Sequence, residues 1–485
     1  MKRLTTLDLG FIFLEKRNQP LHVAYLNLYS LPADASADFV HKLVDHLRTY
    51  ATPLPPFNQR LESRLGTAHW VEDPEFDINQ HIVHLALPRP GSIRDLLAMV
   101  SRMHASHLDR AYPLWRTYVI EGIEGGRIAT YSKVHHAVAD GIAGTRLMLK
   151  SMSAVPDEIL PPAWALPPRG RREPGGLLTA PVNTAAKLAG RFSDAFGSVP
   201  RIVRELRQSL REYRGKHPDF VSGLSAPSSI LNRRISASRR FAAQSYALSR
   251  VKSAGRALGY TVNDIVLGMC SYALRKYLLE LKALPDKALI AMVPMSTRRD
   301  HSDSGNQIAF FLANLGTHLA QPRERLRVIK ASVDHAKQRF SSMQPGEILG
   351  YGAALMGPGL INMLVNPVPK RLPFNVIISN VPGPKAPMYW QGCKLEGMYP
   401  VSAIADGLAL NITLTSRHDF LDFGLIACRR TLPHVQRLLE YLEEGLAEIE
   451  SLMPASAIQQ NESSRHAAAH TLKQDKVIRL DQGRI

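Results

Sequence analysis

The chain has 485 residues, of which 45% are hydrophobic and 21% are charged, and it carries a formal net charge of +18. At ~150 residues per domain this length corresponds to two or three domains, and the composition excludes a wholly disordered chain, a collagen and a coiled coil. Three cysteines, Cys270, Cys393 and Cys428, lie far apart, which excludes a disulfide-stapled scaffold, gives no zinc signature and fits a reducing compartment. The basic charge indicates an anionic partner: nucleic acid, an anionic membrane surface or phosphorylated small molecules.

Residues 1–155 alternate helix-like and strand-like patterns. Apolar residues recur at helical spacing over residues 39–47 and over residues 93–103. Strand-like runs cover residues 23–29, 115–120 and 128–134. The apolar stretch 9–14 is too short for a secretory signal, because three charged residues close it. This part of the chain is predicted to be an α/β or α+β domain.

Residues 156–225 read as a linker between two α/β regions. The segment begins with paired prolines and glycines, and residues 199–213 then show an apolar stripe with arginines on the opposite face. From 226 to 455 a second α/β domain follows, with a helix over 262–281, strands at 289–293, 374–378, 409–415 and 421–427, and a last helix after Pro433. Residues 456–485 are polar and are predicted to be a disordered tail.

The longest charge-free run, residues 348–369 with its apolar part at 348–365, is long enough to span a bilayer, which takes ~20 residues. Its glycines and prolines argue against a transmembrane helix. The run suits either an acyl-chain wall or membrane-facing surface, or an ordinary kinked core helix.

The stretch with the clearest chemistry is residues 131–141. A predicted strand runs into His135 and His136, and Asp140 and Gly141 precede a helix-like pattern. Histidine is suited to take a proton near neutral pH, an Asp before a helix can cap it or engage a cation, and Gly permits a tight turn. The alternative is a surface His-His pair with a capping Asp. Neighbouring histidines on a strand point to opposite faces, so they do not readily share one metal ion, and no HExxH motif is present.

Five ordered motifs together resemble those of the bacterial wax ester synthase/acyl-CoA:diacylglycerol acyltransferase family. This family belongs to the HHxxxDG acyltransferase and condensation-domain superfamily. The matches span residues 1 to about 453: Leu7-Asp8 with Pro20-Leu21-His22-Val23, Pro113-Leu114-Trp115, the HHxxxDG motif itself, Asn263-Asp264, and Ser379-Asn380-Val381-Pro382-Gly383-Pro384. Departures include Ala24 in place of Gly, Arg417 after Ser416 where a Tyr is usual, and an acidic Asp406-Gly407.

The resemblance implies two chloramphenicol-acetyltransferase-like α/β domains with the active site in a tunnel between them. It implies that His136 is the general base for a fatty alcohol or diacylglycerol that attacks acyl-CoA directly, without an acyl-enzyme. His135 would belong to the same catalytic motif, and Asp140 and Gly141 would fix its loop. Asn263, Asp264 and residues 113–115 would shape the site. Acyl-CoA is then a substrate, and the resemblance implies neither a cofactor nor a metal.

Each supporting motif also has a purely structural interpretation. Residues 113–115 could be a strand entry with a core Trp, Asn263 a helix N-cap, and residues 379–384 a strand ending in a turn. No dinucleotide loop, P-loop or GxSxG elbow is present, which excludes the nucleotide-hydrolase and serine-hydrolase readings.

Two other functions compete with lipid O-acyl transfer. The first is a superfamily acyltransferase with a non-lipid alcohol acceptor. The second is a non-enzymatic nucleic-acid- or membrane-binding protein, which no helix-turn-helix, zinc-finger or RNP pattern supports and which leaves the histidine motif without a role.

The basic charge is concentrated in the linker region. Residues 169–240 hold 15 basic and 5 acidic residues, more than half of the net +18. The amphipathic pattern at 199–213 suits an anionic membrane or lipid-droplet surface, or a solvated helix packed on the protein. We therefore expect a cytoplasmic protein, peripherally associated with the membrane or lipid inclusions, with no nucleic-acid partner.

Overall fold

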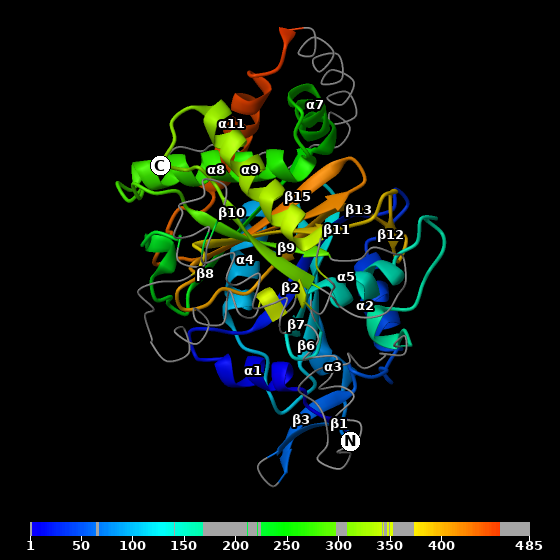
Figure 1. Cartoon of the computed structure of the whole chain (residues 1–485). Coiled ribbons are helices and arrows are strands. Elements are labelled where there is room, and N and C mark those ends of the chain that lie inside the picture. Colours follow the sequence, from blue (N-terminus) through cyan, green and yellow to red (C-terminus); the bar gives the residue numbers. More distant parts are fainter. Residues whose placement is uncertain are drawn as a thin grey trace.

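The computed structural model describes residues 2–64, 67–139, 141–167, 211, 221, 225–296, 308–341, 343, 347–348, 350–352 and 373–455. Most of the amphipathic linker pattern, most of the apolar run at 348–365, Asp140 and the predicted tail at 456–485 lie outside this description. Within it, the chain forms two six-stranded sheets and one small sheet, covered by helices (Figure 1).

The first large sheet has the order β12-β13-β2-β7-β6-β5. Its members are β2 (His22–Ser30), β5 (Ile82–Ala86), β6 (Trp115–Ile123), β7 (Arg127–His135), β12 (Tyr389–Trp390) and β13 (Cys393–Val401). The three strands predicted in the first half of the chain are β2, β6 and β7, each slightly longer than expected. Strand β7 is central and pairs antiparallel with β2 on one side and β6 on the other, so its end is fixed from both sides.

The second large sheet has the order β10-β9-β11-β14-β15-β8. It consists of β8 (Arg239–Ala247), β9 (Ile290–Ser296), β10 (Ile308–Asn314), β11 (Val376–Pro382), β14 (Leu410–Arg417) and β15 (Phe420–Cys428). Four of these are the strands that the sequence predicts, and β8 and β10 were not anticipated. A third, small sheet of β1 (Lys2–Arg3), β4 (Thr67–Glu72) and β3 (Gln59–Arg64) lies at the end of the molecule near α1 (Thr6–Leu14) (Figure 1).

The predicted helices of the first half are α2 (Phe39–Arg48) and α4 (Ile93–Ala105). Helix α4 begins with a capping box, in which Ser92 Oγ accepts the Asp95 N–H and Asp95 accepts the Ser92 N–H. Its apolar face packs into a core shared with strands of both large sheets. The backbone N–H of Phe241 in β8 donates to Ser101 Oγ of α4 at 2.9 Å, so this helix joins the two halves. The remaining short elements are α3 (Ile78–His81), α5 (Gly141–Lys150), η1 (Ala163–Ala165) and η2 (Ile230–Asn232).

Four helices, α7 (Leu248–Leu258), α8 (Val262–Glu280), α9 (Pro322–Ser341) and α11 (Arg437–Glu450), gather at the end opposite α1 (Figure 1). Helix α8 is buried over most of its length, which explains its apolar sequence. Helix α11 crosses it at Gly445, where a Cβ would lie 2.9 Å from Tyr272 Cβ, so the close approach requires glycine.

Strand β13 links the two halves. It follows the second-domain strand β11 in the chain, yet it pairs antiparallel with β2 in the first sheet. It also touches the second sheet, since a Cβ on Gly424 of β15 would lie 1.9 Å from the Pro400 carbonyl oxygen. Arg417, the residue that departs from the family pattern, pairs with buried Asp422 at 2.7 Å, and Asp422 accepts the Met398 N–H of β13 at 2.8 Å. Chain from the predicted C-terminal domain therefore completes the N-terminal sheet.

Candidate active site

The two adjacent histidines lie where β7 ends, and the neighbouring strands hold their backbones. The His135 N–H donates to the Leu114 carbonyl at 2.9 Å, and the His136 N–H donates to the Leu21 carbonyl at 3.0 Å. The motif residues 113–115 are thus part of the support of the histidine pair. The two histidines differ in their exposure to solvent, because His135 is buried whereas His136 is half-buried. We therefore treat the two rings as having separate roles.

The ring of His136 stacks on the ring of Phe11, which belongs to α1. Their centroids are 4.5 Å apart and their planes differ by 14°. Stacking fixes the plane of an imidazole and removes water from one of its faces. Helix α1 was not predicted, because its residues are mostly apolar and show no amphipathic stripe.

His135 has a tautomer set by its neighbours. Its Nδ1 accepts the Ala137 N–H at 3.1 Å, so the hydrogen of the neutral ring belongs on Nε2. That Nε2 faces the Glu15 carboxylate, with 3.6 Å between Nε2 and Oε1. Both ring nitrogens of His135 therefore face protein groups, Nδ1 in a hydrogen bond and Nε2 at 3.6 Å from the carboxylate, which fits a supporting role.

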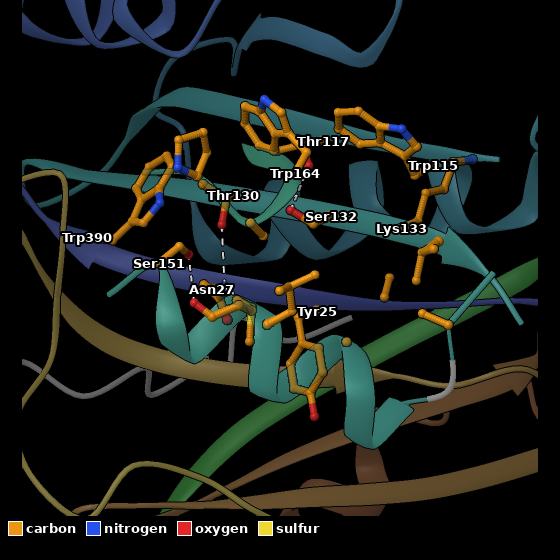
Figure 2. A pocket seen from close by; sticks show the side chains of 18 of the residues that line it. Tyr25, Asn27, Trp115, Thr117, Thr130, Ser132, Lys133, Ser151, Trp164 and Trp390 are labelled. Carbon is orange, nitrogen blue, oxygen red and sulfur yellow. Dashed lines mark hydrogen bonds between the residues drawn. The ribbon is translucent and has the colours of Figure 1, made fainter. Parts of the chain in front are cut away.

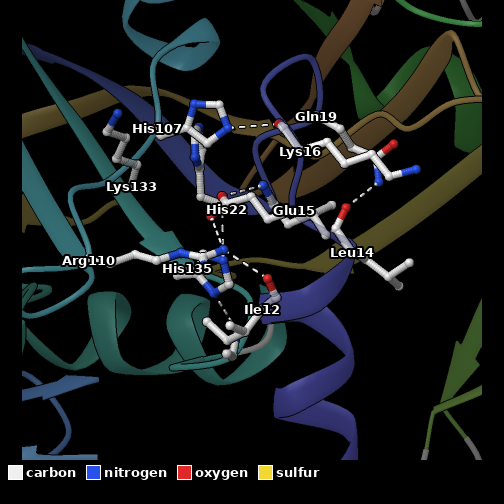
Figure 3. Close-up of polar contacts among 12 residues, drawn as sticks. Ile12, Leu14, Glu15, Lys16, Gln19, His22, His107, Arg110, Lys133 and His135 are labelled. Carbon is white, nitrogen blue, oxygen red and sulfur yellow. Dashed lines mark hydrogen bonds and ion pairs between the residues drawn. The ribbon is translucent and has the colours of Figure 1, made fainter. Parts of the chain in front are cut away.

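Glu15 stands at the centre of this support (Figure 3). Its Oε1 accepts the Leu21 N–H at 3.1 Å, and its Oε2 accepts from Arg110 at 2.9 Å. Burial raises the pKa of Glu15, but the nearby His135 ring and the hydrogen bonds from Leu21 and Arg110 outweigh burial and lower the pKa to about 2. Glu15 is therefore a charged, nearly buried carboxylate that ties the end of α1 to both histidines.

From the sequence alone, Glu15 was interpreted only as the first of three charged residues that follow the apolar stretch 9–14. The available signal was its place between that stretch and the motif at residues 20–23. Its partners His135 and Arg110 lie too far along the chain to be read from a local pattern.

A second set of polar side chains is buried behind β7. Lys133 Nζ donates to the carbonyls of Met103 and Ser106 at 3.1 and 3.0 Å, and burial lowers its pKa to about 8. His104 contacts the Tyr131 hydroxyl at 2.7 Å, and burial lowers the pKa of His104 to about 3. These groups fasten α4 to the sheet.

A largely apolar pocket opens on the other side of the first sheet (Figure 2). It encloses about 870 Å³ of empty space, part of it open to solvent. The walls are alternate residues of β2, β6 and β7, together with α5 and the indoles of Trp115, Trp164 and Trp390. Along β7 the lining runs from Thr130 through Ser132 to Val134, and Ala139 of the histidine motif also contributes. The pocket therefore reaches from a tryptophan-rich end to the candidate catalytic motif.

The other predicted site residues fall as follows. Trp115 lines the pocket, and its indole N–H donates to the Phe57 carbonyl at 2.8 Å. Gly141 is the first residue of α5, and Asp140 is outside the described residues. The interpretation of Asn263 as a helix cap was wrong, because Thr261 caps α8 and Asp264 completes its capping box. Asp264 is fully buried, and Asn263 lies in the first turn of α8.

No group of three His, Cys, Asp or Glu side chains in the described part of the chain is placed to hold a metal ion. None of the described helices combines the length and the apolar character that crossing a membrane requires.

Comparison with known proteins identifies relatives over almost the whole chain. Residues 4–266 match the family model described as wax ester synthase/diacylglycerol acyltransferase catalytic domain, and residues 304–450 match the WS/DGAT C-terminal domain. The O-acyltransferase WSD of Acinetobacter baylyi is 46% identical over 455 residues, which cover 93% of this chain and 98% of that protein. A Mycobacterium tuberculosis protein named probable diacyglycerol O-acyltransferase is 41% identical and covers 91% of this chain and 97% of its own length.

Solved structures agree with this assignment. The wax ester synthase/diacylglycerol acyltransferase from Marinobacter aquaeolei VT8 superposes with a TM-score of 0.76 at 43% identity, over 93% of this chain and 99% of that one. The first condensation domain of the CDA synthetase gives a TM-score of 0.54 at 14% identity, covering 93% and 96% of the two chains, which shows a shared fold. The predicted α/β fold of the condensation-domain superfamily is therefore confirmed. The chain belongs to the wax ester synthase/diacylglycerol acyltransferase family and is an acyltransferase.

Proposed function

We propose that this enzyme transfers a long-chain acyl group from acyl-CoA to the hydroxyl of a fatty alcohol, of diacylglycerol, or of both, with His136 as general base. The observation that carries the proposal is the placement of His136. Its backbone is held at the end of β7, its ring is stacked by Phe11, and an apolar pocket reaches the same motif.

In the proposed reaction His136 accepts the proton of the acceptor hydroxyl as its oxygen attacks the thioester carbonyl. The tetrahedral intermediate then collapses with cleavage of the C–S bond, and the CoA thiolate receives a proton from the imidazolium. The acyl group passes directly to the acceptor, so no acyl-enzyme forms. An aliphatic alcohol is a weak nucleophile near neutral pH, and a positioned base typically supplies about 10²- to 10⁴-fold in rate.

The remaining motif residues receive supporting roles in this proposal. His135 orients the strand end through Glu15 and Ala137. Within the motif at residues 113–115, the Leu114 carbonyl holds the His135 backbone and Trp115 lines the pocket. Asp140 and Gly141 shape the turn into α5, and Asn263 and Asp264 shape the site from the second domain.

The pocket supports a substrate with a hydrocarbon chain. Its lining is mostly apolar and aromatic, as expected for a site that takes a chain out of water. The names of the matching family and of its solved member, wax ester synthase and diacylglycerol acyltransferase, point to the two acceptor classes. An acyltransferase with a non-lipid alcohol acceptor remains the second candidate, favoured by the fold that this chain shares with condensation domains.

The deciding experiment measures release of free CoA thiol by the purified protein from one long-chain acyl-CoA. Hexadecanol, diacylglycerol and short polar alcohols are compared as acceptors, and the esters are identified by mass. We expect turnover with hexadecanol, diacylglycerol or both. Turnover with polar alcohols alone would favour the second candidate, and full activity of His136→Ala would refute the general-base assignment.

We also propose that the enzyme is cytoplasmic and works at an anionic membrane or lipid-droplet surface. The support is the concentration of arginine in residues 199–213. Within this range the structure describes only Arg211, which is helical and exposed. Co-sedimentation with liposomes containing phosphatidylglycerol tests it. Charge reversal at Arg204, Arg207 and Arg211 should weaken binding, and unchanged binding would contradict the proposal.

A further inference from the structure

Residues 15–21, named here the histidine-supporting loop, connect α1 to β2. The loop holds both histidines: Glu15 faces His135 Nε2 at 3.6 Å, and the Leu21 carbonyl accepts the His136 N–H at 3.0 Å. Glu15 also accepts the Leu21 N–H at 3.1 Å, so the two ends of the loop are bonded to each other. A shift of this loop would therefore be transmitted to both imidazoles.

The middle of the loop is held from the second half of the chain. Asp406 is buried in the turn between β13 and β14, and its Oδ1 accepts the Asn18 side-chain amide at 3.1 Å. The Asp406 backbone N–H donates to Gln19 Oε1 at 2.9 Å. The same Oδ1 accepts the Ile235 N–H at 3.0 Å, which fixes the carboxylate itself. Asp406 is the acidic residue that departed from the family pattern.

Two further side chains, those of Arg239 and Gln19, hold this arrangement in place with hydrogen bonds. Arg239, at the start of β8, donates to the Asn18 carbonyl at 2.7 Å and to the Ser236 carbonyl at 2.6 Å. Gln19 Nε2 donates to the Leu14 carbonyl at 3.0 Å, at the last turn of α1. That helix carries Phe11, which stacks on His136. The second domain thus reaches the ring of His136 by two routes, through the loop and through α1.

We propose that Asp406 is a positioning residue, which couples the docking of the second domain to the geometry of His136 through Asn18, Gln19 and the histidine-supporting loop. The proposal rests on the proposed function, in which His136 is the general base. The active-site histidine is then aligned only when the turn at residues 405–408 is seated against the loop. A base displaced by about 1 Å can lose about 10²-fold in rate, so a small loosening of this contact is measurable.

The test compares Asp406→Ala with Asp406→Asn and with Asn232→Ala. Asparagine keeps an oxygen that can accept from Asn18 and Ile235, so it should retain most of the activity. Asn232 is a matched control, because its side chain donates to the Gly407 carbonyl at 2.9 Å in the same turn. The Asn232 side chain supports the turn, and its hydrogen bonds to the described residues do not reach the loop.

We expect Asp406→Ala to lower kcat about 10- to 100-fold while KM for acyl-CoA and for the alcohol changes less than about threefold. Asn232→Ala should leave kcat within about threefold of wild type. In a protein that already carries Glu15→Gln, Asp406→Ala should lower kcat by a much smaller factor than it does alone, because both changes act through the same loop. The proposal would be overturned if the effects of Glu15→Gln and Asp406→Ala on kcat were fully additive in free energy. It would also be overturned if Asn232→Ala lowered kcat as much as Asp406→Ala does.

A second measurement does not depend on activity. Hydrogen exchange of the free protein should speed up at the amides of residues 15–22 and 135–137 in Asp406→Ala and remain slow in Asn232→Ala. If Asp406→Ala does not fold, Gln19→Met removes the bonds to Asp406 and Leu14 at similar volume and serves the same test. Absence of CoA release by the wild-type protein would refute the proposed function. If Asp406→Ala and Gln19→Met both kept the hydrogen-exchange rates and the kcat of the wild-type protein, the coupling alone would be refuted.

Discussion

Glu15 and His135 face each other at the end of β7, with 3.6 Å between Oε1 and Nε2 and both side chains almost fully buried. The carboxylate also binds Arg110 and the backbone of Leu21. The arrangement makes the first histidine of the pair part of a charged, buried cluster and leaves the second, His136, stacked beneath Phe11.

Replacing Glu15 by Gln should make stability less dependent on acid. Burial raises the pKa of Glu15, but the nearby His135 ring and the hydrogen bonds from Leu21 and Arg110 lower it to about 2, from 4.5. A lowered pKa adds stability that is present above pH 4.5 and is lost as the pH falls toward 2. Wild type should therefore exceed Glu15→Gln in unfolding free energy at pH 6, with the gap narrowing below pH 4.5. Urea unfolding across this range measures it, and a gap that stays constant with pH would contradict it.

His135 and His136 should separate stability from catalysis. His135→Ala leaves a buried Glu15 carboxylate oxygen with one partner fewer, which should lower the unfolding free energy by about 1–3 kcal/mol. His136→Ala should have a smaller effect on stability and lower kcat by about 10²- to 10⁴-fold. Thermal unfolding and CoA release measured on both variants decide this. Equal effects of the two substitutions on both readouts would show that the histidines share one role.

Phe11→Ala should free the ring of His136. The loss of the stacked ring lets the imidazole tilt and admits water to its face, so we expect kcat to fall about 10-fold and acylation of His136 by diethylpyrocarbonate to quicken. Phe13→Ala is the matched control, because Phe13 belongs to the same helix and is 79% exposed. A comparable loss of kcat in Phe13→Ala would assign the effect to α1 as a whole.

Gly144→Leu should shorten the chain that the enzyme accepts. Gly144 lines the pocket from α5, and a Cβ there would meet no atom within 4 Å, so the larger side chain has room to enter the empty space. We expect activity to fall more for palmitoyl-CoA or hexadecanol than for eight-carbon analogues, with Gly144→Ala close to wild type. An unchanged preference for both the acyl donor and the alcohol would show that neither chain uses this pocket.

The parts of the fold and site that sequence reasoning found are local ones. The strand that ends in His135 and His136, the helix at residues 93–103 and the support at residues 113–115 are each visible as a short pattern, and the structure contains them. Glu15 and Asp406 were not identified as site residues, because their partners come from distant parts of the chain. The alternative interpretation of Asn263 as a helix cap was wrong because Thr261 provides that cap, and both residue types favour the position. Helix α1 lacks the polar face by which a helix is recognised.

Strand β13 has a consequence for how the protein must be made. One edge of β2 has no partner strand until residues 393–401, which form β13, have been synthesised. The histidine motif is complete some 250 residues earlier in the chain. An exposed strand edge invites pairing with other chains, so the nascent first half is a candidate for chaperone capture and aggregation. Cutting the enzyme at the linker should therefore not yield two independently folding halves, and a fragment ending near residue 226 should become soluble only when the β12–β13 segment is supplied with it.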